Sequence, residues 1–302
     1  MLKESVLKLT FGLSVLLQQL HGGEPLSLNQ NRMNDFCMDF DKSSWKIPHE
    51  LFIIHTIPKC GTHFIERTIR LMTSHGIVNR YITQVNLEEA CKNDKVLRSI
   101  QVFRKSLVTT LKNSGHRCLA MHRDPRDALI SHIFYMRNYP KNPTGDNTLR
   151  DFFRVGPEFD DISFEEQLNA LIVGNKYSDS YIKFYKERIN WALSGFALPV
   201  KYEDLLGFKG GGSDKTQKLL VSKIAKHLNL NLTMDQLQMV LDHMYEEQGD
   251  RGDPEYIVEG KAYKRSVTGN WKVFLNSKQK TLIKKMIGQE LIQLKYEKNN
   301  NW

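Results

Sequence analysis

Residues 53–64, with the sequence IIHTIPKCGTHF, combine a short apolar run with a Pro-Lys-Cys-Gly-Thr loop. The bulky, partly β-branched residues at 51–54 are typical of a buried strand. Pro58 and Gly61 then interrupt the regular pattern, and apolar residues recur at helical spacing over 64–72. The segment therefore predicts a strand, a tight loop and a helix.

A loop of this kind suits an anion. It directs backbone N–H groups and the positive end of the helix toward one point in space. Lys59 in the loop adds a mobile positive charge, and Thr62 at the start of the helix adds a hydroxyl. The nucleoside-triphosphate pattern G-x-x-x-x-G-K-[ST] is not met, because the lysine precedes the glycine and no glycine stands at the required upstream position. An anion site and an ordinary turn both remain possible for this corner.

A second corner repeats the pattern further along the chain. The apolar run at 118–121 predicts a strand, and Pro125 suits the first turn of the helix that follows. Arg123 leaves the strand, Arg126 follows, and Ser131 stands eight residues after Arg123. Open parallel sheets bind ligands at the carboxyl ends of their strands. Both corners together therefore predict one ligand with two separated phosphate-like groups.

The neighbouring acidic residues offer a different interpretation of the arginines. Arg123 is followed directly by Asp124, and Arg126 by Asp127. Surface arginines are mostly solvated or paired in this way, and such pairs contribute little free energy. Both interpretations stay open from the sequence.

Strand and helix patterns alternate along the rest of the chain. Residues 196–206 predict a third strand after a helical pattern at 164–193, and the segment 84–114 has a mainly helical pattern. Glycines at 207 and at 210–212 predict a surface loop. This alternation predicts an α/β fold, a single domain with a central, mostly parallel sheet flanked by helices. Further helices are predicted at 216–228, 234–247 and 278–295.

The first 45 residues are predicted to be an N-terminal leader or helix, and residues 46–298 to be the folded domain. Lys3 and Lys8 precede the stretch LTFGLSVLL, which has the length of a signal-peptide apolar region. The polar residues of the same segment also fit an amphipathic helix or a loose leader, and a cleaved signal stays an alternative. No stretch of about 20 apolar residues that would span a membrane is present.

Composition favours an anionic ligand and disfavours several other classes. The 302 residues carry nine more Lys and Arg than Asp and Glu, which favours anionic partners. The basic residues are scattered, which is untypical of a nucleic-acid binder. Cysteines at 37, 60, 91 and 118 form no zinc pattern, so no metal site is predicted, and reduced thiols favour a cytoplasmic location. No feature indicates an oligomeric state.

Four segments, taken together, resemble the sulfotransferases that use 3'-phosphoadenosine 5'-phosphosulfate. They are TIPKCGTHF at 56–64, HRDPRDALIS at 122–131, KYEDLL at 201–206 and KRSVTGNWKVF at 264–274. Their order and spacing match the family over residues 50–296. The resemblance implies transfer of a sulfuryl group from this co-substrate to a hydroxyl or amine of a small-molecule or carbohydrate acceptor, without a metal.

The resemblance also implies roles for particular residues. The loop after the first strand would be a P-loop-like phosphosulfate-binding loop, with its lysine over the bridging oxygen. Arg123 and Ser131 would bind the 3'-phosphate. Tyr202 and, more weakly, Tyr245 would approach the adenine, on which Phe64 would stack. The implied site residues are Lys59, which is also the catalytic group, and Cys60, Gly61, Thr62, His63, Phe64, Arg123, Ser131, Tyr202, Lys264, Arg265 and Ser266.

The sequence departs from the family at several of these positions. Cys60 replaces a serine and His63 replaces a threonine. A backbone donor survives the change at Cys60, and a thiol beside the Lys59 ammonium could ionise and oxidise. In the segment 264–272, which resembles the signature that closes over the 3'-phosphate, Ser266 replaces a glycine.

The catalytic base of the family has no clear counterpart. Cytosolic members carry a histidine upstream of the arginine that binds the 3'-phosphate, and the corresponding stretch of this chain contains none. This gap leaves a second function open, that of a non-catalytic nucleotide-binding relative. The residues that could act as the base instead are Glu88, Glu89, His63, His75 and His116.

Phosphoryl transfer from ATP is a rival function. The missing G-x-x-x-x-G-K-[ST] pattern disfavours it.

Overall fold

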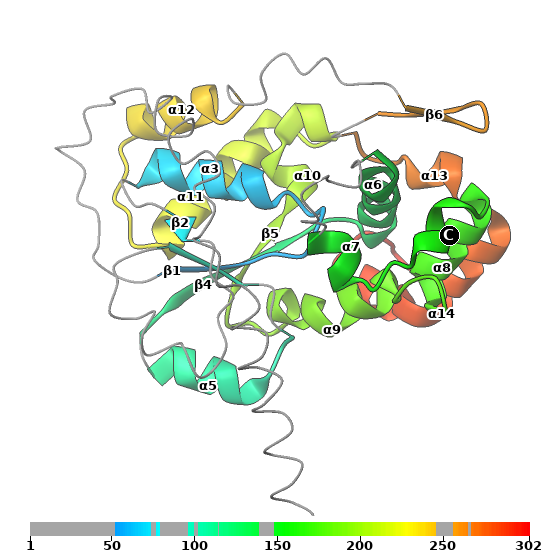
Figure 1. Cartoon of the computed structure of the whole chain (residues 1–302). Coiled ribbons are helices and arrows are strands. Elements are labelled where there is room, and N and C mark those ends of the chain that lie inside the picture. The colour runs from blue at the N-terminus through cyan, green and yellow to red at the C-terminus, as the bar shows by residue number, and fades with distance from the viewer. Residues whose placement is uncertain are drawn as a thin grey trace, which may run out of the picture. The chain divides into compact units, whose positions relative to one another are not determined.

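The computed structural model describes residues 52–73, 77–78, 96–99, 102–113, 115–138, 148–245, 256–264 and 267–302 (Figure 1). The predicted bounds of the leader at 1–45 and of the domain at 46–298 stay predictions. Several residues singled out in the sequence lie outside the described residues, namely His75, Glu88, Glu89, Arg265 and Ser266.

Five strands of the described residues form one sheet in the order β2-β3-β1-β4-β5. Every pairing in this sheet is parallel, and β1 lies between β3 and β4. The predicted α/β fold with a central parallel sheet is thereby confirmed. The strands are β1 (Phe52–His55), β2 (Ile77–Val78), β3 (Val96–Ser99), β4 (Arg117–His122) and β5 (Leu198–Lys201).

Helices follow the strands, as the alternating pattern predicts. An antiparallel hairpin of β6 (Tyr256–Val258) and β7 (Lys261–Tyr263) interrupts the second half of the chain. The described helices are α3 (Thr62–Met72), α5 (Lys105–Asn113), α6 (Pro125–Asn138), α7 (Thr148–Phe152), α8 (Phe164–Val173), α9 (Tyr181–Leu193), α10 (Tyr202–Leu205), α11 (Asp214–His227), α12 (Met234–His243), α13 (Trp271–Phe274) and α14 (Ser277–Gln293), with the 3-10 turns η1 (Pro157–Asp160) and η2 (Gly207–Gly210).

The neighbouring strands β1 and β4 are buried on both faces. Successive residues of a strand point to opposite faces, so Ile53, Cys118 and Ala120 join one core, which α5, α6, α8, α9 and α14 complete. Ile54 and Leu119 join the other core, which α3, α11 and α12 complete. Figure 1 shows α5 and α9 on one side of the sheet and α3 and α12 on the other. Burial on both faces explains why β1 and β4 consist mainly of apolar residues in succession.

Two helical predictions need correction. The segment 84–114 contains a strand at 96–99, because β1 and β2 pair with it on either side, and such pairing outweighs local propensity. The pattern at 164–193 is two helices rather than one. Gly174, with φ of 80°, ends α8, and the hydroxyl of Ser180 caps α9. The predicted helices of the C-terminal half are present as α11, α12 and α14.

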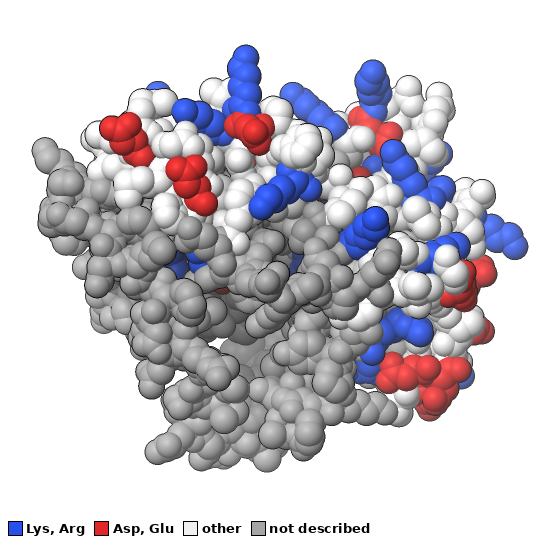
Figure 2. Space-filling model, turned by 90° about the horizontal axis from the view of Figure 1, so that it is seen from above, with Lys and Arg blue, Asp and Glu red and all other residues white. Residues whose placement is uncertain are grey.

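Charged side chains on the face shown in Figure 2 are mixed. Lys and Arg stand at separate places, with Asp and Glu among them, which matches their scattering along the sequence. None of the described helices is long and apolar enough to cross a bilayer. Within the described ranges, no group of three or more His, Cys, Asp or Glu side chains is arranged to hold a metal ion. The absence of nucleic-acid binding stays a prediction.

Candidate functional site

The carboxyl ends of β1 and β4 define the candidate site. The two strands are parallel neighbours, with His55 opposite Ala120, so both end at the same edge of the sheet. The helices that follow them diverge, since α3 packs into the core on one face and α6 into the core on the other. Ligands of open α/β sheets bind at such a point of divergence. The two corners recognised in the sequence therefore meet at one place.

The loop between β1 and α3 has a backbone that suits an anion. Lys59 and Gly61 have positive φ values of 68° and 94°. Gly61 is the N-cap of α3, so no side chain caps the helix, and the first turn contains no acidic residue. The helix therefore presents its first N–H groups and the positive end of its dipole without a carboxylate from that turn.

Gly61 is required by packing as well as by its φ. A Cβ atom on this residue would lie 2.3 Å from Cδ2 of Tyr202 and 2.8 Å from Cε of Met121. Tyr202 is the first residue of α10 and directly follows β5. The loop after β1 thus touches the ring that follows β5, and only glycine allows so close an approach.

Replacing Gly61 by alanine is expected to lower the free energy of unfolding by about 2–4 kcal/mol, because strain at a positive φ adds to overlap with Tyr202. Gly115 is a matched control. Its φ is also positive, 72°, and no atom lies within 4 Å of the place its Cβ would take. Gly115→Ala is expected to cost about 1 kcal/mol. Urea unfolding of both variants tests the argument, and equal losses would contradict it.

Lys59, the predicted catalytic group, reaches from the loop to α6. Its Nζ lies 4.1 Å from the ring centroid of Tyr135, a cation–π contact. The hydroxyl of Tyr181 donates to the carbonyl of Pro58 at 2.7 Å, so α9 supports the same loop. Tyr135 is a site residue that the sequence analysis missed. Its signal is its place on α6 one helical turn after Ser131.

Arg123 is the buried cation of the site, with 3% of its surface exposed. Its guanidinium donates to the carbonyls of Lys59 at 3.2 Å and Val267 at 3.3 Å, and lies 4.7 Å from the Tyr202 ring. Burial lowers the pKa of Arg123, but nearby Tyr202 and Asp127 help raise it, and the net shift is upward. Within the described residues its Nε is buried without a partner. A buried cation with an unused donor fits an anionic ligand.

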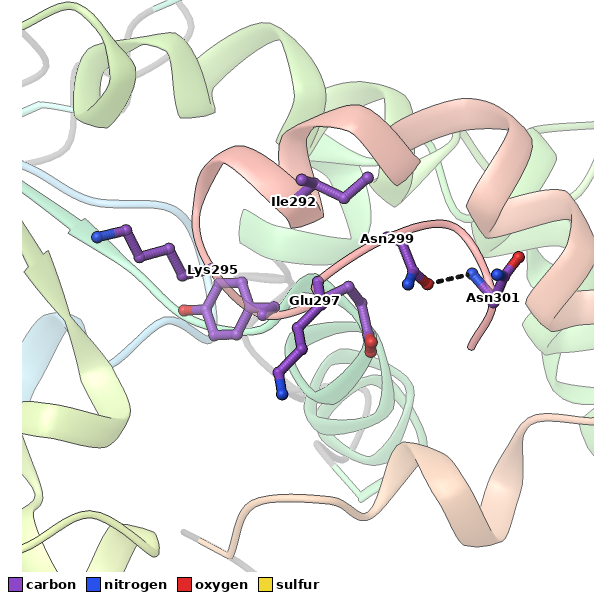
Figure 3. Close-up of a pocket in the computed structure, with 7 residues that line it drawn as sticks. Ile292, Lys295, Glu297, Asn299 and Asn301 are labelled. Carbon is purple, nitrogen blue, oxygen red and sulfur yellow. Dashed lines mark hydrogen bonds between the residues drawn. The ribbon is translucent and has the colours of Figure 1, made fainter.

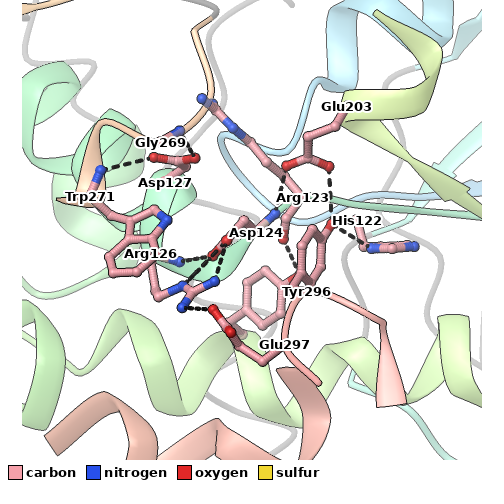
Figure 4. Close-up of polar contacts among 11 residues, drawn as sticks. His122, Arg123, Asp124, Arg126, Asp127, Glu203, Gly269, Trp271, Tyr296 and Glu297 are labelled. Carbon is pink, nitrogen blue, oxygen red and sulfur yellow. Dashed lines mark hydrogen bonds and ion pairs between the residues drawn. The ribbon is translucent and has the colours of Figure 1, made fainter. Parts of the chain in front are cut away.

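Arg126 does not belong to this anion-binding set. Its guanidinium pairs with Asp124 at 2.7 Å and with Glu297 at 2.5 Å (Figure 4). Of the two interpretations that the sequence left open, pairing with an acidic neighbour is the correct one for Arg126. Of these two arginines, Arg123 is therefore the one that belongs to the candidate site.

A network of hydrogen bonds joins the ends of β4 and β5 to the segment after α14. The hydroxyl of Tyr296 donates to Oε2 of Glu203 at 3.1 Å and lies 3.0 Å from Nδ1 of His122. Oε1 of Glu203 accepts the N–H of Asp124 at 3.0 Å. Burial raises the pKa of Glu203 and lowers that of His122 to about 3. Figure 4 shows these residues beside Arg123.

Asp127 fastens the segment that resembles the family's closing signature. Its carboxylate accepts the N–H of Gly269 at 2.6 Å and the N–H of Trp271 at 3.0 Å (Figure 4). The side-chain amide of Asn270 donates to the carbonyl of Lys264 at 3.0 Å. The first turn of α6 therefore holds a segment more than a hundred residues further along the chain.

The aromatic residues predicted to receive the adenine lie on the α3 side of the loop. Phe64 and Tyr245 are in ring contact, with centroids 5.4 Å apart. The hydroxyl of Tyr245 donates to the carbonyl of Leu206 at 2.6 Å. Tyr202 lies between Gly61 and Arg123. Their contacts with adenine stay a prediction.

Cys60 and His63, two neighbouring residues of the loop region, differ in burial. Cys60 is fully buried and its N–H donates to the carbonyl of Ile57 at 3.0 Å. Burial raises the pKa of its thiol to about 12, which disfavours ionisation of this thiol. His63 has a side chain that is 88% exposed, with Nδ1 3.5 Å from Oε2 of Glu66. Its side chain therefore faces solvent in this structure.

The other predicted contacts are placed only in part. Thr62 is the first residue of α3, as predicted, and Ser131 lies within α6. Both are partly exposed, and Lys264 is exposed. No hydrogen bond between described residues joins Ser131 to Arg123.

Of the candidate bases that the structure describes, His63 lies in the first turn of α3 and His116 lies away from the loop, whereas His132, a histidine that the sequence analysis did not consider, lies near the loop. His116 precedes β4 and so lies at the opposite edge of the sheet from Lys59. His132 on α6 is fully buried, and its ring stacks on Tyr181 with centroids 4.7 Å apart. Neither ring nitrogen of His132 has a hydrogen-bond partner among the described residues. Burial, helped by the charge of Lys59, lowers its pKa to about 3.

The buried His132 is expected to make stability depend on pH. Its folded pKa of about 3 lies below the ordinary 6.5, so the stability of the neutral form is complete above pH 6.5 and is lost as the pH falls toward 3. His132→Phe removes this titration. As the pH falls from 6.5 toward 3, the free energy of unfolding of the variant should therefore fall less steeply than that of wild type, and the two slopes should differ by about 1.4 kcal/mol per pH unit. Met136→Leu on the same helix is the control and should run parallel to wild type. Urea unfolding at several pH values tests this, and parallel curves for His132→Phe would contradict it.

Known proteins share this fold. A family model described as the sulfotransferase domain matches residues 49–295. No curated protein matches the chain. The crystal structure of mouse sulfotransferase SULT7A1 complexed with PAP is 15% identical, covers 82% of this chain and 86% of its own, and has a TM-score of 0.54. A structure of retinol dehydratase with androsterone and the inactive cofactor PAP is 14% identical, covers 81% of each chain, and has a TM-score of 0.49.

At these identities the likeness to solved structures concerns the fold alone. The family model, by contrast, spans most of the chain and includes the loop after β1, the start of α6, and the segment fastened by Asp127. The chain therefore belongs to the sulfotransferase domain family.

Proposed function

We propose that the protein transfers a sulfuryl group from 3'-phosphoadenosine 5'-phosphosulfate to a hydroxyl or amine of a small-molecule or carbohydrate acceptor. The observation that carries this proposal is the buried Arg123, which is hydrogen-bonded to the loop of Lys59 and whose Nε has no partner among the described residues. Family membership supports the reaction class. The PAP in the mouse sulfotransferase structure supports a nucleotide of this kind as the ligand.

The proposed chemistry needs positive charge near a leaving oxygen. The donor, when bound, supplies an activated sulfuryl group. Lys59 and the N–H groups at the start of α3 would stabilise the negative charge that develops on the oxygen released, which is usually the largest catalytic contribution. The flexible stem of Lys59 allows its ammonium to exchange the Tyr135 ring for an anion. The proposal includes no metal.

Nucleotide binding is proposed to use both corners. Gly61 and Thr62 would hold the phosphosulfate, while Arg123 and Ser131 would hold the 3'-phosphate. Tyr202 and Phe64 would contact the adenine. The remaining proposed contacts are Cys60, His63, Lys264, Arg265 and Ser266. A cytoplasmic location also stays a prediction.

A nucleotide-binding relative without catalysis is the second candidate. The observation that favours it is the position of the histidines, since His63 faces solvent and His116 lies at the opposite edge of the sheet. Such a protein would bind the nucleotide at the same residues and would not transfer the sulfuryl group.

Calorimetric titration of 3'-phosphoadenosine 5'-phosphate into the full chain tests the shared part of both candidates. Binding that ATP does not compete away supports the nucleotide site, and a folded protein without affinity would refute it. A panel of phenols, alcohols, amines and carbohydrates, incubated with the sulfated donor and followed by mass spectrometry, then separates them. A sulfated product supports the enzyme, and nucleotide binding without any product supports the relative.

A further inference from the structure

Arg126 is enclosed by groups from distant parts of the chain. Its guanidinium, in a residue only 1% exposed, lies 3.8 Å from the ring centroid of Trp271 and 4.4 Å from that of Trp302. Asp124 and Glu297 satisfy its charge. We call these five residues the Arg126 clasp. Because the clasp is desolvated, its cation–π contacts belong to the stronger end of their range.

The segment 297–302 packs onto the clasp from one side. The ring of Trp302 meets that of Trp271 edge-on, with centroids 5.8 Å apart. Nζ of Lys284 donates to the carbonyl of Trp302 at 2.8 Å and so ties the segment to α14. Glu297 pairs with Arg126 and also borders a hollow of about 790 Å³ (Figure 3). The hollow is lined by Ile292, Lys295, Tyr296, Glu297, Lys298, Asn299 and Asn301.

The clasp is continuous with the segment that resembles the family's closing signature. Trp271, a member of the clasp, has its N–H bound by Asp127, and Asp127 also binds the N–H of Gly269. Arg126 and Asp127 are adjacent in the first turn of α6. The carbonyl of Val267 in the same segment accepts from Arg123. A displacement of Trp271 would therefore move atoms that contact the arginine proposed to bind the 3'-phosphate.

We propose that Trp302 is a positioning residue of the nucleotide site. Through the Arg126 clasp it holds Trp271, and with it residues 267–271, against α6, so that the groups proposed to receive the 3'-phosphate are preorganised. This inference rests on the proposed function. It predicts that Trp302 affects the binding of the 3'-phosphate and not the binding of the rest of the nucleotide.

The test compares two nucleotides that differ in that phosphate. Calorimetry measures the Kd of 3'-phosphoadenosine 5'-phosphate and of adenosine 5'-phosphate for the full chain and for Trp302→Ala. The Kd of the bisphosphate is expected to rise about tenfold, and that of adenosine 5'-phosphate to stay within about twofold. Trp302→Phe keeps an aromatic face and should restore most of the affinity. Equal weakening for both nucleotides, or no weakening, would overturn the proposal.

Tyr177→Ala is the matched control, because its ring also contacts a cation, with Nζ of Lys176 at 4.7 Å, but belongs to the connection between α8 and α9. It should leave both Kd values unchanged. If Trp302→Ala does not fold, Glu297→Gln weakens the same clasp and keeps the size of the side chain. The same selective loss is expected for Glu297→Gln, and its absence would count against the clasp.

Hydrogen–deuterium exchange gives a readout that needs no nucleotide. The N–H groups of Gly269 and Trp271, both bound by Asp127, should exchange faster in Trp302→Ala than in wild type. Unchanged exchange rates would overturn the proposal, whether or not the proposed function is correct. Faster exchange in a protein that binds neither nucleotide would refute the function and leave the clasp supported.

Discussion

Lys59→Ala is expected to lower kcat for sulfuryl transfer by about 100- to 1,000-fold, the loss typical of removing one preorganised group that stabilises transition-state charge. The ammonium is the mobile charge of the loop, held 4.1 Å from the Tyr135 ring, and it is proposed to meet the oxygen that leaves the sulfur. Because that charge develops only during transfer, the Kd of 3'-phosphoadenosine 5'-phosphate should change far less than kcat. Steady-state kinetics and calorimetry on the same preparation separate the two effects.

Lys176→Ala is the control for this substitution. Its Nζ also lies over an aromatic ring, that of Tyr177, away from the strand ends. It should keep wild-type kcat. A Lys59→Ala protein with kcat within a few-fold of wild type would remove Lys59 from the catalytic role, and a large loss of nucleotide affinity with unchanged kcat would make it a binding residue only.

Arg123→Met is expected to raise the Kd of 3'-phosphoadenosine 5'-phosphate by about 10- to 100-fold, since a hydrogen bond to a charged group contributes roughly 1.5–3 kcal/mol. Methionine keeps an unbranched chain and removes the charge and the donors. Arg123 is nearly fully buried, and its Nε has no hydrogen-bond partner among the described residues. Adenosine 5'-phosphate, which lacks the 3'-phosphate, should lose much less affinity. Calorimetry with both nucleotides measures the difference.

Arg154→Met is the matched control, because this arginine is 80% exposed and pairs with Asp179 at 2.8 Å. It should leave both Kd values unchanged. Thermal unfolding must accompany the Arg123 variant, since Arg123 also donates to the carbonyls of Lys59 and Val267. A folded Arg123→Met protein that binds the bisphosphate as tightly as wild type would place the 3'-phosphate elsewhere.

Local patterns in the sequence were sufficient to predict the two corners of the site. The apolar runs before Lys59 and Arg123 become β1 and β4, and parallel pairing alone brings their ends to one edge of the sheet. The features that sequence reasoning missed depend on contacts between distant residues. The strand β3 forms because its neighbours pair with it, and Tyr135 meets Lys59 only once α6 packs beside the loop.

The charge states and ion pairs of the site were the hardest features to predict from the sequence. Sequence proximity of Cys60 to Lys59 suggested an ionised thiol, but burial raises the pKa of that thiol to about 12. Arg126 stands beside two aspartates in the sequence, and one of them does pair with it. Its second carboxylate partner, Glu297, is 171 positions away, so no local sequence pattern could predict this ion pair. Burial and long-range partners decide these charges, and neither is visible in a short stretch of residues.

The sequence separation within the Arg126 clasp has a consequence for biosynthesis. Domains acquire their structure as the chain emerges from the ribosome, beginning with the N-terminal part. Both corners that follow β1 and β4 are made early, whereas Glu297, which is 171 positions after Arg126, and Trp302 are made only after the five strands of the sheet. A nascent chain can therefore contain the whole sheet and still lack the clasp. Ribosome-bound intermediates of this protein would carry Arg126 without its late partners until synthesis has passed residue 302.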